Sequence, residues 1–199
     1  FVGYQTSLYE FTSWTASSTS GSYPTGMSFR CTTTVDATLV AAVGGGYIGP
    51  TDATATGFGL RGEGNNGISL LNTGSTNANC PNGGNGLLAT IDIPVNTVGR
   101  TNINVYWSAA QISDQGREWG LRLQYSTDGS SFSDVPGPVE FRTDSIGSST
   151  AYSNFGPTTL PVAAENNANL ILRWRYYFIS GAAGSRTRIA IDEVKIAGN

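Results

Sequence analysis

Histidine is absent from the 199 residues, which excludes several kinds of catalysis. Without an imidazole the chain has no Ser-His-Asp or Cys-His nucleophilic pair, no histidine-ligated zinc and no imidazole acid or base. The glycine-rich fragments Gly57–Gly59 and Gly62–Gly64 lack the strand-turn-helix setting and the full spacing of a dinucleotide-binding loop. We interpret both fragments as turns.

Charge and long apolar runs are also scarce. Asp, Glu, Lys and Arg make up 13% of the chain, where about 25% is usual, and Lys195 is the single lysine among 11 basic residues. The formal net charge is −3 and there is no basic block, so the electrostatic features of nucleic-acid or lipid binding are missing. The longest apolar run, Ala37–Val43, is far shorter than the roughly 20 residues of a membrane span. We expect no nucleic-acid partner and no membrane insertion.

Only two cysteines are present, Cys31 and Cys80. In a secreted protein an even number predicts a disulfide, which over a loop of this length would stabilise the fold by roughly 4 kcal/mol in the chain-entropy model. Two buried free thiols are the alternative. Because the chain begins at Phe1 without an initiator methionine, we interpret it as a processed protein or an excised domain and expect a secreted, cell-surface location.

Short strand patterns fill the chain, and no long window keeps apolar residues at helical spacing. In Asn169–Ser180 the side chains alternate with a period of two, and the turn Gly181–Gly184 leads into a returning strand, Ser185–Ile196. Further strands are predicted at Phe1–Phe11, Met27–Thr34, Asp36–Val43, Phe58–Arg61, Ile68–Asn72, Leu87–Ile93, Thr101–Ser108, Glu118–Ser126, Val139–Arg142 and Tyr152–Leu160. We predict an all-β protein, a two-sheet antiparallel, jelly-roll-like β-sandwich that forms one domain over residues 1–199.

The final strand contains an irregularity that suggests a metal site. Its apolar positions are odd up to Ile191 and even from Val194, so Asp192-Glu193 is predicted to form a β-bulge. Glu10 would meet Asp192 if the first and last strands are neighbours, and Ca²⁺ takes roughly six to eight oxygen ligands. We therefore expect a structural calcium ion bound by Glu10 and Asp192. The alternative is that Asp192 only hydrogen-bonds backbone groups in the bulge.

A polar sheet face is a candidate ligand site. If Thr101–Ser108, Glu118–Ser126 and Asn169–Ser180 share a sheet, its surface presents Tyr106, Arg122, Gln124, Arg173, Arg175 and Tyr177. Guanidinium forks and aromatic planes suit a neutral sugar, through bidentate hydrogen bonds and stacking. A solvated or loop-covered sheet face is the alternative.

The carboxylates are the remaining candidates for catalysis. A glycosidase needs two carboxyl groups about 5 to 9.5 Å apart, and Glu63, Glu118 and Glu140 lie on or beside predicted strands. None of the three lies in a recognisable motif, so we interpret them as solvated carboxylates. We predict that the protein is not an enzyme.

The N-terminal segment Phe1–Phe11 is apolar and strand-like. Such a segment can complete the sheet edge of a neighbouring molecule, and head-to-tail contacts of this kind produce fibres. The alternative is that Phe1–Phe11 is the first strand of its own sandwich.

Several segments carry a resemblance to a known class of module: Gly64–Asn72, Arg122–Tyr125, Asp134–Glu140, Leu172–Tyr177 and Ile191–Val194. Over about residues 58–196 the chain resembles a β-sandwich module of secreted, cell-surface bacterial multidomain proteins, which implies fold and location more than activity. More loosely, Glu10-Phe11 and Ile191–Val194 resemble jelly-roll carbohydrate-binding modules. That resemblance implies a structural calcium where the first and last strands meet, with Glu10 and Asp192 as ligands. The chain lacks the exposed tryptophan pair that such modules use for sugar stacking.

Two functions follow from these observations. The first is a non-enzymatic extracellular structural or adhesive protein that self-assembles into a surface filament by strand addition, with other copies of itself as partners. The second is a carbohydrate-binding module with an extracellular polysaccharide as partner.

Overall fold

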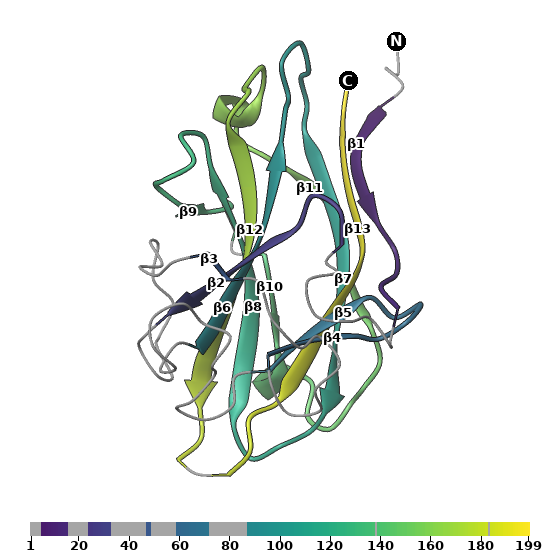
Figure 1. Cartoon of the computed structure of the whole chain (residues 1–199), viewed down its shortest axis with the longest axis vertical. Coiled ribbons are helices and arrows are strands. Elements are labelled where there is room, and N and C mark those ends of the chain that lie inside the picture. The colour runs from purple at the N-terminus through teal and green to yellow at the C-terminus, as the bar shows by residue number, and fades with distance from the viewer. Residues whose placement is uncertain are drawn as a thin grey trace.

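The structure, a computed structural model, describes residues 5–15, 24–32, 47–48, 59–71, 87–137, 139–182 and 184–199. Within these residues lie thirteen β-strands and two short 3-10 helices, at Thr143–Ser145 and Val162–Ala164. The strands form two antiparallel sheets that pack as a β-sandwich (Figure 1). The predicted all-β sandwich is therefore confirmed, while the jelly-roll connectivity stays a prediction. The predicted strand Asp36–Val43 lies outside the described residues.

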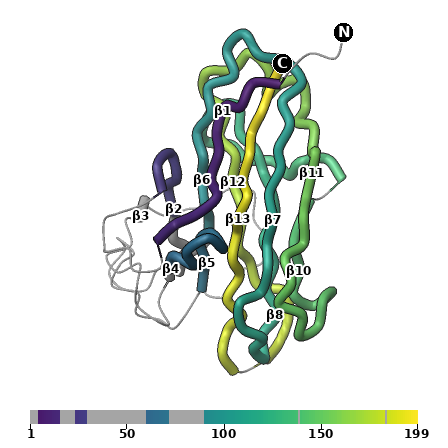
Figure 2. The backbone as a smooth tube through the Cα atoms, turned by 90° about the vertical axis from the view of Figure 1, so that its right-hand side faces the viewer, coloured from purple at the N-terminus to yellow at the C-terminus, as the bar shows by residue number. Residues whose placement is uncertain are grey.

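Sheet 1 contains six strands. Their order is β11 (Ser153–Thr159), β7 (Asn104–Ser113), β13 (Arg188–Gly198), β5 (Ile68–Leu71) and β4 (Gly59–Gly62), and β1 (Thr6–Phe11) also pairs with β13. One edge of β13 is shared, because β5 pairs with residues 189–191 and β1 with residues 194–198. The first and last strands are therefore neighbours, and Figure 2 shows β1 running along β13.

Sheet 2 has the order β10 (Glu140–Arg142), β8 (Glu118–Ser126), β12 (Leu170–Ser180), β6 (Leu87–Val95), β2 (Ser28–Thr32) and β3 (Tyr47–Ile48), and the two-residue strand β9 (Ser133–Asp134) also pairs with β8. The long alternating strand β12 is central, with β8 on one side and β6 on the other. Alternate residues of a strand point to opposite faces. Leu172, Trp174 and Tyr176 therefore point into the core.

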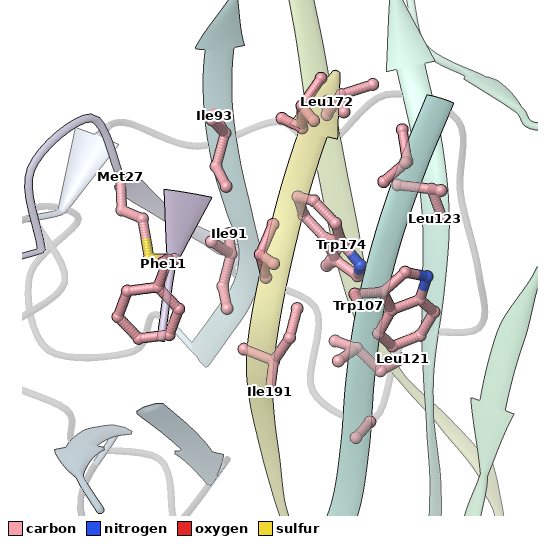
Figure 3. Close-up of a cluster of buried hydrophobic side chains, with 14 of the residues drawn as sticks. Phe11, Met27, Ile91, Ile93, Trp107, Leu121, Leu123, Leu172, Trp174 and Ile191 are labelled. Carbon is pink, nitrogen blue, oxygen red and sulfur yellow. The ribbon is translucent and has the colours of Figure 1, made fainter. Parts of the chain in front are cut away.

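Apolar side chains from both sheets meet between them (Figure 3). Trp107 of sheet 1 contacts Trp174 of sheet 2 edge to face, with ring centroids 6.1 Å apart. Such aromatic pairs contribute roughly 0.5–1.5 kcal/mol beyond the burial of their area. At the end of β1, Phe11 lies in this core near Met27 and Ile91 (Figure 3). Phe11 thus ties β1 to the body of the sandwich.

The predicted bulge at Asp192-Glu193 is confirmed. Asp192 lies opposite Ser108 and Lys195 opposite Tyr106, so β13 has one more residue than β7 across this interval. Glu193 adopts a left-handed backbone conformation with φ 51°. The bulge lies where the edge partner of β13 changes from β5 to β1.

One structural expectation is wrong. β7 belongs to sheet 1, whereas β8 and β12 belong to sheet 2, so the three strands do not share a sheet. Tyr106 consequently lies on the opposite side of the sandwich from the other predicted ligand-binding residues. The period-two pattern identifies the two faces of a strand but does not say which sheet contains it.

Candidate functional site

Five of the six predicted ligand-binding residues share the outer face of sheet 2. They are Arg122 and Gln124 on β8 and Arg173, Arg175 and Tyr177 on β12. The register places Arg122 opposite Arg175 and Gln124 opposite Arg173. We call these five residues and their bonded partners the sheet 2 face.

Arg173 is enclosed within the sheet 2 face. Its Nε donates to Asp92 Oδ1 on β6 and its Nη2 donates to Asp92 Oδ2, both at 2.7 Å. The ring of Phe132 covers the guanidinium, with its centroid 3.3 Å from Cζ, and Arg173 is only 2% exposed. A buried guanidinium needs this bidentate partner, because an unpaired buried charge is strongly destabilising.

A second group of bonds centres on Glu140 of β10. Arg122 Nε and the Tyr177 hydroxyl donate to the same carboxylate oxygen, at 2.7 and 2.6 Å. Burial alone would raise the pKa of Glu140, but these hydrogen bonds outweigh it and lower the pKa. Burial and the bond to Glu140 raise the pKa of Tyr177 to about 12. The hydroxyl is therefore a stable donor and a poor general base.

Strand β9, which pairs with β8, provides a further carboxylate partner. Arg122 Nη1 and Gln124 Nε2 each donate to Asp134 of β9, both at 2.9 Å. Burial is the larger cause and repulsion from Arg173 the smaller cause that lower the pKa of the fully buried Arg175 to about 10.

The donors of Arg122, Arg173 and Tyr177 are directed at carboxylates of the same face rather than at solvent.

Gly120 on β8 makes room for Tyr177. The two residues are directly opposite in the register. A Cβ atom at position 120 would overlap the Tyr177 ring, so only glycine allows the ring to lie over the backbone of β8. The position of the hydroxyl that binds Glu140 therefore depends on this glycine.

The three carboxylates considered for catalysis all accept hydrogen bonds, and they do not all lie on one sheet. Glu63, beside β4, accepts bonds from Arg61 Nε at 2.7 Å and Ser69 Oγ at 2.5 Å on sheet 1. On sheet 2, the hydroxyl of Thr143 donates to Glu118 and Arg122 donates to Glu140. Glu63 lies on a different sheet from the other two.

The outer face of sheet 1 is hollowed around the bulge. One depression of about 230 Å³ is lined by Glu10, Thr12, Glu193, Val194 and Lys195. A second of about 320 Å³ is lined by Tyr106, Trp107, Asn154, Phe155, Gly156, Glu193 and Lys195. Since they share Glu193 and Lys195, we treat them as one surface and call it the sheet 1 depression. Lys195 Nζ lies 3.4 Å from Glu10 Oε1, and about half of each side chain is exposed.

Glu10 and Asp192 lie on this sheet but in different surroundings. Glu10 is exposed and opposite Lys195, and hydrogen bonds to Ser7 and Lys195 lower its pKa. Asp192 is 6% exposed, and burial raises its pKa to about 6 despite a hydrogen bond from the Glu193 backbone. Among the described residues, the Oδ1 atom of Asp192 has no hydrogen-bond partner.

The surroundings of Glu10 and Asp192 bear on the calcium prediction. Asp192 Oδ1 is buried and accepts no hydrogen bond from the described residues, whereas Glu10 bonds the ammonium group of Lys195. In the part of the chain that the structure describes, no three acidic, cysteine or histidine side chains converge. A calcium ion would need further oxygen ligands. The calcium site stays a prediction.

The disulfide also stays a prediction. Cys31 lies in β2 opposite Leu88, and Cys80 falls outside the described residues.

Sequence reasoning missed the partners that enclose the arginines. Asp92, Asp134 and Phe132 were not singled out, although Asp92 alternates with two buried isoleucines and therefore had to face outward. That alternation was the one available indication, because the opposing residue depends on the strand pairing.

The described residues include no helix with the length and hydropathy needed to cross a membrane. No protein-family model matches the chain, and a search of curated proteins found no significant match. The two-sheet sandwich is therefore established by the structure alone, and no family is identified.

Proposed function

We propose that this protein is a non-enzymatic, extracellular structural or adhesive β-sandwich that self-assembles into filaments through strand β1. The observation that carries the proposal is the attachment of β1. It is a six-residue strand at the edge of sheet 1, paired only with β13 among the described strands. Phe11 is its single fully buried residue.

An edge strand of this kind supports assembly for a physical reason. Its unpaired N–H and C=O groups provide a template for another chain, and its own pairing with β13 can be formed equally well by a second copy. A head-to-tail contact uses two different surfaces, and it yields fibres when the rotation between successive copies does not close a ring. The low charge limits repulsion between copies.

The secreted location and the resemblance to bacterial cell-surface modules are part of this proposal. They rest on the sequence features given above. The bonds of Arg122 to Glu140 and of Arg173 to Asp92 support a structural role for the sheet 2 face, because these two guanidinium groups already have carboxylate partners.

The test compares the full chain with a variant that lacks residues 1–11. We expect fibres or high-order particles from the full chain in light scattering and negative-stain electron microscopy, and no assembly from the truncated chain. Circular dichroism must show that the truncated body remains folded. Asp144→Asn, which alters an exposed charge in the 3-10 helix after β10, serves as a matched control and should assemble normally. A full chain that remains monomeric at high concentration contradicts the proposal.

Saccharide binding is the second candidate, favoured by the sheet 1 depression. Tyr106, Asn154 and the half-exposed Lys195 line a hollow there, in contrast to the enclosed arginines of sheet 2. The test is calorimetric titration with neutral, amino and acidic oligosaccharides. Loss of binding in Tyr106→Ala with retention in Arg122→Ala would assign the site to sheet 1, and the reverse would assign it to sheet 2. No binding by the unmodified protein contradicts this candidate.

A further inference from the structure

We infer that β1 is exchanged between copies: the β1 strand of one chain occupies, along β13 of the next chain, the place that it occupies in the single chain. This inference rests on the proposed function and specifies both the donated strand and its acceptor. The alternative is that β1 stays on its own body and a neighbour adds to its free edge.

The contacts of β1 favour exchange because they form a transferable set. Its backbone pairs with residues 194–198. Among side chains, the Tyr9 hydroxyl donates to the Thr25 carbonyl at 3.0 Å, and Arg100 Nη1 donates to Thr6 Oγ1 at 3.2 Å. All these partners belong to the body of the sandwich, at residue 25 or later. The body of a second copy offers the same partners.

A short connection between two fixed points allows the strand to be redirected. Thr12 and Ser13 are exposed and lie outside any strand. Beyond them, Trp14 is fixed to Gly64 by two backbone hydrogen bonds of 3.0 and 2.9 Å. The chain can therefore turn away at Thr12 and Ser13 without disturbing the anchor at Trp14. A few residues at an element terminus are enough to act as a hinge.

Phe11 distinguishes exchange from edge addition. Its side chain enters the core from the strand directly beside β13 (Figure 3). A strand added outside β1 would lie one position further from the core and could not bury an equivalent anchor. In addition, the pairing of β1 shifts between Ser7 and Tyr9, and irregularities of this kind disfavour further pairing on an edge strand.

Opposing cysteines test the exchange directly. Glu10 and Lys195 are directly opposite and half-exposed. Opposed antiparallel residues have Cα atoms about 4.5–5.5 Å apart, within the range of a disulfide. A Glu10→Cys chain is mixed with a Lys195→Cys chain, and the mixture is assembled and gently oxidised. The linked peptides are then mapped by mass spectrometry. Because each chain carries one new cysteine, a link between positions 10 and 195 forms only between chains.

We expect a prominent 10–195 link in the assembled mixture. Each variant oxidised alone controls for links through Cys31 and Cys80. An Asp144→Cys chain mixed with the Lys195→Cys chain is the matched negative pair, since position 144 lies in the 3-10 helix that follows β10 of sheet 2 and not beside β13.

The outcomes separate this inference from the proposed function. Assembly with the interchain link supports exchange. Assembly without it, together with an intrachain link in the Glu10→Cys/Lys195→Cys double variant, overturns exchange and leaves the proposed function standing. Absence of assembly in the unmodified chain overturns both.

Discussion

The two outer faces of the sandwich differ in how far their charged side chains are buried. On the sheet 2 face, Arg173 is 2% exposed and paired with an equally buried Asp92. On sheet 1, Lys195 and Glu10 remain 50% and 55% exposed beside a depression. A concentration of arginines therefore does not by itself mark a binding surface. Where their partners are supplied by neighbouring strands, the charges hold the sheet together.

The largest expected effect is at the buried pair of the sheet 2 face. Arg173→Ala leaves Asp92 buried without its partner and is expected to lower the free energy of unfolding by about 3–5 kcal/mol. Urea denaturation measures the loss. The double variant Arg173→Met/Asp92→Leu removes both charges and should recover most of the stability. A loss of under about 1 kcal/mol in Arg173→Ala would show that the buried pair of sheet 2 stabilises the fold no more than an exposed ion pair such as the one on sheet 1.

The pH dependence of Asp192 should be the next largest effect, and it belongs to sheet 1. Its pKa is raised to about 6 in the folded protein, so its contribution to stability is fully present below the unfolded pKa near 4 and is lost as pH rises through about 6. A shift of this size corresponds to a loss of roughly 2–3 kcal/mol by pH 8. Urea denaturation at a series of pH values measures the free energy of unfolding, and Asp192→Asn should remove this pH dependence.

The Asp192 profile also tests the calcium prediction. Bound calcium would favour the ionised carboxylate, so millimolar calcium should raise the unfolding midpoint at pH 8 in the unmodified protein and not in Asp192→Asn. Equal midpoints with calcium and with a chelator would contradict the calcium site. A flat profile in the unmodified protein would show that Asp192 is not desolvated.

Gly120→Ala tests how closely the sheet 2 face is fitted. The new methyl group overlaps the Tyr177 ring, and we expect a loss of about 1–3 kcal/mol in the free energy of unfolding. Adding Tyr177→Ala removes the overlap, so the double variant should lose less than the sum of the single losses. Simple additivity in this double-mutant cycle would contradict the proposed contact.

The smallest effect is expected from the exposed pair on sheet 1. Exposed ion pairs stabilise a fold very little, so Lys195→Met should leave the unfolding midpoint unchanged within error. Arg122→Met, which removes a largely buried partner of Glu140, should lower the midpoint measurably. Equal shifts in the two variants would remove the distinction between the faces.

The features of this fold that depend on periodicity could be predicted from the sequence. Alternation along β12 indicated which of its residues face outward, and the phase shift between Ile191 and Val194 located the bulge. The pairing partners could not be read in the same way. Asp92 and Arg173 are 81 positions apart and meet only because β6 and β12 pair in one register. The prediction that Tyr106 shares a face with the arginines is wrong because alternation does not say which sheet contains a strand.

Assembly through β1 is measured most simply by the mass of the unmodified chain in solution. Multi-angle light scattering over a wide concentration range, with negative-stain microscopy of the same samples, provides it. If copies assemble through β1, the mass grows with concentration and fibres appear on the grid. A mass equal to one chain at every concentration, with no fibres, would contradict it.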